Sequence, residues 1–207
     1  IAGKLGLFKN GADIFITPSE FLRMQLIKGG FPPEKIISVP NPAVVEANEK
    51  SHSKEDYAAY SGRISVEKGI NTLIESAKDN PDINIKIAGD GPLKKEIESK
   101  APSNVTFTGY LNKHELGIFL EKARFTIFPT ICYETFGLAA LEAMAYGTPV
   151  IASDIGALPE FIKDGVDGYL FSPGNSEELS EKMRLLWNDS SLRDKFSENA
   201  KIKAAHY

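Results

Sequence analysis

From residue 57 onward, short apolar segments alternate with longer segments in which apolar residues recur every three or four positions. The short segments, rich in Val, Ile and Phe, predict strands at 57–61, 83–88, 105–108, 125–128 and 149–152, with a weaker one at 169–171. The longer segments predict helices at 69–78, 93–100, 113–122, 137–146, 177–186 and 191–205. Strands separated by helices of this length form βαβ units, so the pattern predicts an α/β fold with a Rossmann-like, doubly wound parallel sheet.

Two of these helices carry local signals for where they begin. Asn112 followed by Glu115 has the spacing of a capping box, in which the Asn side chain accepts from the backbone and the Glu side chain reaches back. Pro92 suits a first helical position, where the N–H that proline lacks would have no partner within the helix. We therefore expect helices to begin at these two points.

The first 56 residues follow a different pattern. They predict a strand at 13–16, a helix at 19–28 and a second strand at 35–39, whereas 47–56 is polar and aperiodic. Two strands and one helix are too few to form an independent core, so we interpret 1–40 as the end of a preceding α/β unit. Residues 41–56 are interpreted as a linker, and 57–207 as the main domain.

Composition excludes several classes of protein. The 207 residues include 24 Lys and Arg against 28 Asp and Glu, and this net charge of −4 argues against a dedicated nucleic-acid binder. A single cysteine, Cys132, allows no internal disulfide and indicates a reducing compartment. The three histidines lie far apart in sequence, so no metal site is predicted, and no apolar run is long enough to span a bilayer.

The segment 133–150 carries the most specific chemistry. Glu134 falls in a loop after a strand, and Glu142 lies on the second turn of the helix that follows. Helix N-termini attract phosphates, and ligands of parallel sheets bind at the carboxyl ends of the strands. Glu142 shares a helix face with Leu138, so its carboxylate can face ribose hydroxyls in the same crevice. The alternative is that both glutamates are solvated surface charges.

A second candidate site lies at 61–69, between the first strand of the main domain and its helix. Gly62 gives a flexible backbone beside two cations, Arg63 and Lys68. Arginine binds phosphate oxygens in a fork and lysine acts as a point charge, so the pair could neutralise a diphosphate without a metal ion. The alternative is a surface ion pair with Glu67.

A third glycine-rich loop, at 88–94, follows a strand and leads into a helix. Gly89 invites a dinucleotide-binding interpretation, but the third glycine of that fingerprint would fall at Lys94, so the match fails. A tight turn between strand and helix explains the loop without any ligand.

Together these motifs resemble the retaining nucleotide-sugar glycosyltransferases of family 4, also called group 1, which have the two-domain GT-B fold. The most specific part is the pair Glu134 and Glu142, with seven residues between them, within Glu-Thr-Phe-Gly and Glu-Ala-Met-Ala-Tyr-Gly-Thr-Pro-Val. The segments 62–69, 89–92 and 107–111 follow in the family's order, and the resemblance runs from Ala12 to the end. It implies that 57–207 is the C-terminal, donor-binding domain and 1–40 a remnant of the N-terminal, acceptor-side domain.

The resemblance also implies a role for each matching residue in binding a nucleoside diphosphate sugar. Arg63 and Lys68 would hold the diphosphate, backbone N–H groups of Phe136, Gly137 and Leu138 would meet the phosphate or the sugar, and Glu134 would contact a sugar hydroxyl. Glu142 would bind the ribose and Tyr110 and Leu111 the base, with Gly62 beside the cations and Gly89 and Asp90 mainly structural. Glu134, Arg63 and Lys68 are the predicted catalytic residues, since the cations would stabilise the leaving diphosphate and Glu134 would orient the sugar.

For the whole enzyme, the resemblance implies transfer of a hexosyl group from a UDP-, GDP- or ADP-sugar to an acceptor hydroxyl, with retention at the anomeric carbon. The acceptor would be a saccharide or a lipid-linked molecule, and no metal or other cofactor would be required. This chain would be inactive without its N-terminal domain. We expect a cytoplasmic protein, or one attached peripherally to the inner membrane through that domain.

Two alternatives remain open at this point. One is a non-catalytic module that binds a nucleotide or a sugar phosphate, and the other is a nucleotide-sugar epimerase with the GT-B architecture. The presence of both Glu134 and Glu142 favours the transferase over each.

Overall fold

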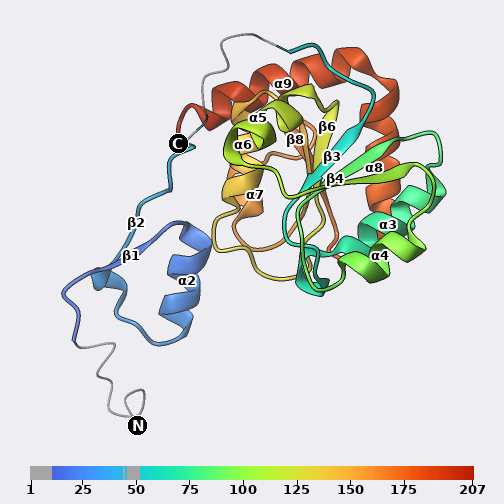
Figure 1. The fold of residues 1–207 in the computed structure, drawn as a ribbon. Helices are drawn as coiled ribbons and strands as arrows, with labels where there is room; N and C mark the ends of the chain where they lie inside the picture. Colours follow the sequence, from blue (N-terminus) through green and yellow to red (C-terminus); the bar gives the residue numbers. More distant parts are fainter. Residues whose placement is uncertain (1–10, 44, 46–51) are drawn as a thin grey trace.

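Six parallel strands form the sheet of the main domain (Figure 1). The computed structural model describes residues 11–43, 45 and 52–207. The strands are β3 (Ala58–Ser61), β4 (Ile85–Ala88), β5 (Val105–Gly109), β6 (Phe125–Phe128), β7 (Val150–Ser153) and β8 (Gly168–Phe171). They lie in the order β5-β4-β3-β6-β7-β8, and every neighbouring pair is parallel. This arrangement confirms the predicted α/β fold with a doubly wound sheet.

Helices cover both faces of this sheet (Figure 1). One core includes residues of α3 (Ile70–Asp79), α4 (Lys94–Lys100) and α8 (Ser176–Asn188), and the other includes residues of α5 (Lys113–Lys122), α6 (Leu138–Ala145) and α7 (Leu158–Phe161). The last helix, α9 (Ser190–Ala204), contributes to both cores. Successive residues of β3 alternate between them: Ala58 and Tyr60 join the first core, and Ala59 joins the second. Burial on both faces explains why the central strands β3, β6 and β7 are apolar at most positions, whereas the edge strand β5 alternates apolar and polar residues.

The helix after β4 begins later than predicted. α4 starts at Lys94, so the expectation that Pro92 occupies a first helical position is wrong, and Pro92 lies in the preceding turn. The N–H of Leu93 donates to the carbonyl of Ile64 (3.1 Å). This bond ties the turn to the loop after β3, and the chain enters the helix only beyond it.

Other local signals had different outcomes. The capping box is confirmed, because the Asn112 side chain accepts from the N–H of Glu115 (3.0 Å) and the Glu115 carboxylate accepts from the N–H of Asn112 (2.9 Å). The sequence pattern missed α7 and two 3-10 turns, η1 (Pro33–Lys35) and η2 (Val66–Lys68). Each is too short to display a helical period of apolar residues.

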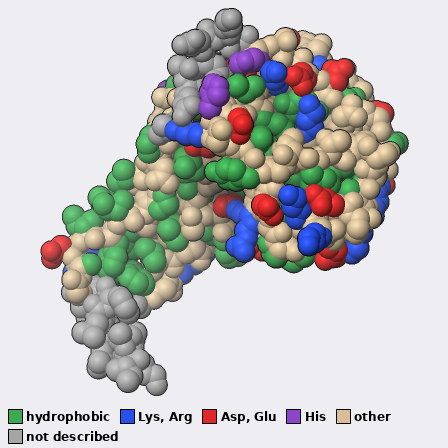
Figure 2. All heavy atoms as spheres, in the orientation of Figure 1, with side chains coloured by type: hydrophobic (Ala, Val, Ile, Leu, Met, Phe, Trp, Pro, Cys, Tyr) green, Lys and Arg blue, Asp and Glu red, His purple; other side chains and the backbone are tan. Residues whose placement is uncertain are grey.

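The N-terminal segment, residues 11–43, forms a separate small unit. β1 (Phe15–Thr17) and β2 (Ile36–Ser38) make a two-stranded parallel sheet, connected through α2 (Glu20–Lys28). The predicted strand, helix and strand are thus confirmed with slightly shifted bounds. No residue of α2 is buried, and apolar side chains gather on the surface of this segment (Figure 2). The exposed ones are Ile14, Ile16, Met24, Ile37 and Val39.

The predicted linker falls partly outside the described residues, which omit 44 and 46–51. The predicted boundaries after residues 40 and 56 therefore stay predictions. Within the described part of the chain, no helix combines the length and the apolar composition that crossing a membrane requires.

Candidate functional site

The chain reverses its direction of winding between β3 and β6, and two cavities lie at the carboxyl ends of the strands there. From β3 the chain proceeds through β4 to β5 on one side of the sheet, then returns to β6 on the other. Ligands of doubly wound sheets bind at such switch points. We call the two cavities the Glu134 cavity and the Tyr110 cavity. Ser61 and Gly62 line both, so the cavities adjoin.

Most of the predicted site residues line one of these cavities. The Glu134 cavity has a volume of about 190 Å³, and the Tyr110 cavity one of about 340 Å³. Besides Gly62, the first is lined by Lys68, Glu134, Gly137 and Leu138, and the second by Arg63, Gly89, Asp90, Tyr110 and Leu111. Phe136 and Glu142 are in neither lining. The structure thus brings together residues from four loops that the sequence places up to 76 positions apart, from Gly62 to Leu138.

Backbone contacts hold the loops after β3 and β4 together. The N–H of Gly62 donates to the carbonyl of Ala88 (3.0 Å), and the N–H of Ile64 donates to that of Asp90 (2.9 Å). Gly89 has a φ of 135°, and a Cβ there would overlap the carbonyl of Gly62. Only glycine therefore allows this approach, which gives Gly89 the structural role predicted for it.

Lys68 and Glu134 form an ion pair across the Glu134 cavity. Lys68 ends η2, which is held against the loop after β6 by hydrogen bonds from the Thr130 hydroxyl and the Ile131 N–H to the carbonyl of Glu67, both 3.0 Å. Both charged side chains are partly exposed, so the pair contributes only about 0–1 kcal/mol and an anionic ligand can compete with Glu134 for Lys68. The alternative pairing of Lys68 with Glu67 does not occur among the ion pairs of the described residues.

Arg63 is exposed at the wall of the Tyr110 cavity, one residue from the point where the two cavities meet. The Tyr60 hydroxyl donates to its carbonyl (2.8 Å), which fixes the backbone while the guanidinium faces solvent. Burial raises the pKa of Tyr60, so this hydroxyl stays protonated and remains a donor. An exposed guanidinium on a fixed backbone suits capture of an anion.

Ser61 belongs to the predicted segment 61–69, but the sequence analysis gave it no role of its own. The residue is 8% exposed, and its hydroxyl has no hydrogen-bond partner among the described residues. A buried hydroxyl without a partner costs about 1–3 kcal/mol, so a ligand oxygen reaching it would relieve this cost. The only sequence signal was its position at the end of a strand, directly before Gly62.

The Tyr110 cavity has a flat aromatic side chain at its entrance. Tyr110 is 81% exposed, as a residue that offers a stacking surface to a planar ligand would be. Asp90 instead serves its own loop, because its carboxylate accepts from the N–H of Gly91 (2.7 Å) and lies 3.8 Å from Lys94. This placement agrees with the mainly structural role expected of Asp90.

Phe136 and Glu142 lie outside the linings of both cavities. The Phe136 ring packs in the core, with its centroid 5.9 Å from that of Phe161, so only its backbone remains for the predicted ligand contact. Glu142 is half-buried on α6, one turn beyond Leu138. Burial raises the pKa of the Glu142 carboxyl, while the charge of Lys113 opposes this shift. Its contact with a ribose stays a prediction.

Neither cavity brings metal-ligating side chains together. Across the described residues, no three His, Cys, Asp or Glu side chains are grouped as a metal site would need. The charged side chains that line the two cavities are Arg63, Lys68, Asp90 and Glu134, and no side chain caps the N-terminus of α6. Two cations and a helix N-terminus can hold an anionic ligand.

A family model and individual relatives with known sequences indicate the same family. The model of the glycosyl transferases group 1 matches residues 45–203. The chain is 32% identical over 200 residues to the uncharacterized glycosyltransferase MJ1178 of Methanocaldococcus jannaschii, covering 92% of this chain and 54% of the relative. It is 30% identical over 215 residues to the sulfoquinovosyl transferase SQD2 of Arabidopsis thaliana, covering 95% and 42%. The chain thus spans about half the length of these relatives, or less.

Comparison with solved structures gives the same fold. The S. aureus TarM G117R mutant, in complex with fondaparinux, α-GlcNAc-glycerol and UDP, matches with a TM-score of 0.83 and 27% identity over 96% of this chain and 41% of TarM. Anabaena Alr3699/HepE, in complex with UDP and glucose, matches with a TM-score of 0.87 over 99% of this chain and 61% of that protein, and at 21% identity it supports the fold alone. Since the family model and the first relative both match most of its length, the chain belongs to the group 1 glycosyltransferases, with the fold of the C-terminal half of a GT-B enzyme.

Proposed function

We propose that the two cavities bind a nucleoside diphosphate sugar, and that the whole protein transfers its hexosyl group to an acceptor hydroxyl with retention at the anomeric carbon. The observation that carries this proposal is the meeting of Lys68 and Glu134 at the N-terminus of α6, beside a cavity that Arg63 and Tyr110 line. A diphosphate needs cations and N–H donors, and a sugar needs a hydrogen-bond acceptor. All of these groups belong to the two adjoining cavities.

Each part of such a donor would have its own place in the two cavities. The base would stack on Tyr110, and the diphosphate would lie over the shared wall at Ser61, between Arg63 and Lys68. The Ser61 hydroxyl would then gain the partner that it lacks. The sugar would occupy the Glu134 cavity, where the Glu134 carboxylate accepts from a sugar hydroxyl, and Glu142 would reach the ribose.

The transfer step follows from where charge develops. The bond between the anomeric carbon and the diphosphate oxygen breaks, its electron pair stays on that oxygen, and the acceptor oxygen bonds to the same face of the sugar. The acceptor proton passes to the leaving phosphate. Arg63, Lys68 and the α6 N-terminus would stabilise the leaving charge, and removing one such cation is expected to cost about 3 kcal/mol, or about a hundredfold in rate.

The relatives support a sugar transferase without specifying the sugar. One is named for mannose, one for sulfoquinovose and one for kanosamine. The TarM structure at 27% identity contains UDP, which makes UDP the first nucleotide to test here. The acceptor, a hydroxyl on a saccharide or a lipid-linked molecule, would be bound largely outside this chain, so we expect negligible transfer by residues 1–207 alone. Robust transfer by the purified chain would refute that expectation.

Isothermal titration calorimetry tests the donor site. The chain would be titrated with UDP, GDP, ADP and NAD, and the best ligand repeated with EDTA and with Arg63→Ala. We expect one nucleoside diphosphate to bind, binding to survive EDTA, and Arg63→Ala to weaken it at least tenfold, as loss of a charge-assisted phosphate contact should. Lys195→Ala, which removes an exposed cation from α9, is the matched control. Absence of binding by every nucleotide, in this chain and in a longer chain that contains it, contradicts the proposal.

A further inference from the structure

We propose that Glu160 and Ser19 are positioning residues, which clamp the N-terminal segment onto the loop that carries Glu134 and so orient Glu134 toward the donor sugar. The role of the clamp in sugar binding rests on the proposed function above, whereas the clamp itself is defined by contacts between described residues. The clamp consists of the contacts that Glu160 and Ser19 make across the boundary between the N-terminal segment and the main domain.

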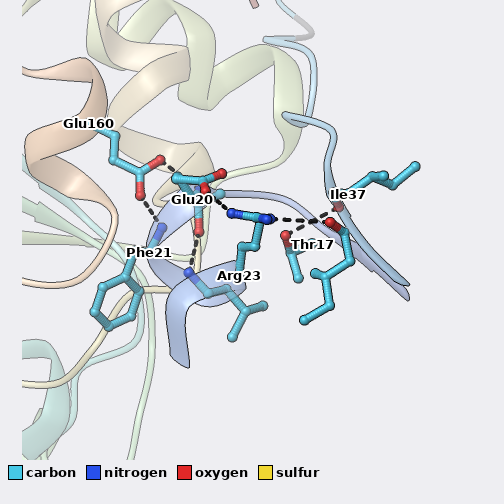
Figure 3. A network of polar contacts seen from close by, with 9 residues as sticks. Thr17, Glu20, Phe21, Arg23, Ile37 and Glu160 are labelled. Carbon is cyan, nitrogen blue, oxygen red and sulfur yellow. Dashed lines mark hydrogen bonds and ion pairs between the residues drawn. The ribbon is translucent and has the colours of Figure 1, made fainter. Parts of the chain in front are cut away.

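Glu160 caps a helix that lies about 140 positions away in the sequence. Its carboxylate, on α7, accepts from the backbone N–H of Glu20 (3.0 Å) and from that of Phe21, the first two residues of α2. Figure 3 shows the carboxylate pointing at this end of the helix. Helix N-termini present N–H groups without intrahelical partners and a positive dipole end, so a carboxylate makes strong hydrogen bonds there.

Ser19 connects the same helix end to the loop that carries Glu134. Its hydroxyl accepts from the N–H of Leu22 (3.1 Å) and donates to the carbonyl of Thr135 (2.5 Å). The Ser19 residue is only 3% exposed although it belongs to a segment with little burial. Beside it, the ring of Phe21 packs on that of Tyr133, with centroids 5.1 Å apart. The N-terminal segment therefore contacts the residues on both sides of Glu134.

The main domain holds the same loop from the opposite side. The N–H of Ala157 donates to the carbonyl of Glu134 (3.0 Å), and Ala157 directly precedes α7, the short helix that carries Glu160. The contacts therefore close a ring, from Glu134 through Ala157 to Glu160, across to α2 and back through Ser19 to Thr135. Loosening the ring at Glu160 or Ser19 frees one side of the loop, and a carboxylate that orients a sugar must be held to within about 0.5 Å.

The first arm of the test measures the clamp without any ligand. Hydrogen–deuterium exchange would compare the unmodified chain with Glu160→Gln, which keeps the shape of the side chain but removes its charge. We expect exchange about threefold faster or more at residues 20–22 and 133–137, because loss of the charged cap shifts the local opening equilibrium toward the open form. Glu181→Gln, at an exposed position of α8, makes the same charge change away from the clamp. Unchanged exchange at 133–137 in Glu160→Gln overturns the proposal.

The second arm asks whether the clamp acts through Glu134. Calorimetry would give the ratio of the affinities for UDP-glucose and UDP in Glu160→Gln and in Ser19→Ala, which alters the other side of the boundary. We expect this ratio to fall about threefold to tenfold in each, with UDP affinity itself within about twofold of the unmodified chain, as loss of one oriented hydrogen bond predicts. In a Glu134→Gln background, both substitutions should leave the ratio unchanged.

The two proposals fail in distinguishable ways. If none of the nucleotides or their sugars binds to the unmodified chain or to a longer chain that contains it, the donor proposal fails, and the exchange experiment still decides whether the clamp exists. If Glu134→Gln lowers the ratio but Glu160→Gln and Ser19→Ala do not, the positioning role fails while the donor site stands. If Glu160→Gln and Ser19→Ala lower the affinity ratio equally in the unmodified chain and in the Glu134→Gln background, the clamp does not act through Glu134 and only stabilises the fold.

Discussion

The main domain buries both faces of its sheet, whereas the N-terminal segment leaves nearly all of its apolar side chains exposed or only partly buried. In the main domain, strand residues such as Phe125 and Ile127 are fully buried between layers of helices. In the N-terminal segment, α2 has no buried residue and Ile16 and Met24 are exposed. The first region is therefore stabilised by its own core, and the second depends on contacts with something else. Among the described residues, those contacts are concentrated at the loop that carries Glu134 and at Glu160.

The two regions also differ in the contacts by which they hold the loops of the site. Loops of the main domain are joined by backbone hydrogen bonds, as between Ile64 and Asp90, and are preorganised by the packed sheet beneath them. The N-terminal segment reaches the site through side chains at one helix end. Regions with few buried contacts open locally at low free-energy cost, so the N-terminal segment is the place where the site can be loosened without unfolding the sheet.

The largest expected effect compares one apolar side chain from each region. Phe125→Ala removes a fully buried ring and is expected to lower the free energy of unfolding by about 3–5 kcal/mol. Met24→Ala truncates a residue that is 44% exposed, and should change the free energy of unfolding by no more than about 0.5 kcal/mol. Urea denaturation followed by circular dichroism measures both. Similar losses in the two variants would contradict the comparison.

A second prediction concerns close backbone contacts within the main domain. Gly69 has a φ of 69°, and a Cβ there would overlap the carbonyl of Pro129. Gly69→Ala is therefore expected to destabilise by about 3 kcal/mol, from strain and overlap together.

Gly174 provides the matched control for this substitution. Its φ of 80° is similar, but no atom lies within 4 Å of the position a Cβ would take. Gly174→Ala should cost only the conformational penalty of about 1 kcal/mol. If the urea midpoints of the two variants shift equally, the contact between Gly69 and the loop after β6 does not matter for stability.

Sequence periodicity sufficed for the sheet, because a strand buried on both faces needs apolar residues whatever its neighbours are. The predicted strand at 125–128 coincides with β6, and the predicted helix at 113–122 coincides with α5. It failed where a long-range contact decides the local structure. Pro92 has the right chemistry to begin a helix, but the N–H of Leu93 donates to the carbonyl of Ile64, and the helix begins only at Lys94.

The candidate site was predictable as far as local motifs and the family resemblance reach. They indicated the glycine loops and the residues Arg63, Lys68 and Glu134, which line the two cavities. They did not indicate the ion pair between Lys68 and Glu134, because 66 positions separate the partners. Nor did they point to Glu160, whose hydrogen-bond partners lie in another part of the fold. Pairings of this kind depend on topology, and no spacing rule encodes them.

A third and smaller effect is expected where the two regions meet. Phe21→Ala removes the ring that packs on Tyr133 and should detach the N-terminal segment more often without unfolding the main domain. Limited proteolysis with trypsin should then cleave within 11–43 about threefold to fivefold faster, since cleavage follows the population of the open form.

Leu185→Ala, at an exposed position of α8, is the control for loss of an apolar side chain away from this boundary. It should leave the cleavage rate in 11–43 unchanged. Faster cleavage throughout the chain in Phe21→Ala, including the segments of the six-stranded sheet, would mean that the two regions unfold as one unit.

The smallest effect separates stability from function inside the main domain. Burial raises the pKa of the Glu142 carboxyl, so over a range of pH the folded state keeps a proton that the unfolded state has released. Stability from this group is therefore present at low pH and is lost as the pH rises through the folded pKa. Gln does not titrate, so the urea midpoint of Glu142→Gln, relative to that of the unmodified chain, should increase between pH 4 and pH 7. Glu181→Gln should show no such trend.

The affinity of the same Glu142→Gln variant for UDP tests whether the Glu142 carboxylate contacts the ribose. If Glu142 accepts from the ribose, the variant should bind UDP about threefold to tenfold less tightly at pH 7 while being more stable, because a ligand hydrogen bond to a charged group is lost. The main domain would then carry a half-buried charge that weakens its fold and strengthens its ligand contact. Unchanged UDP affinity with increased stability would remove Glu142 from the site and leave ribose recognition to the residues that line the Tyr110 cavity.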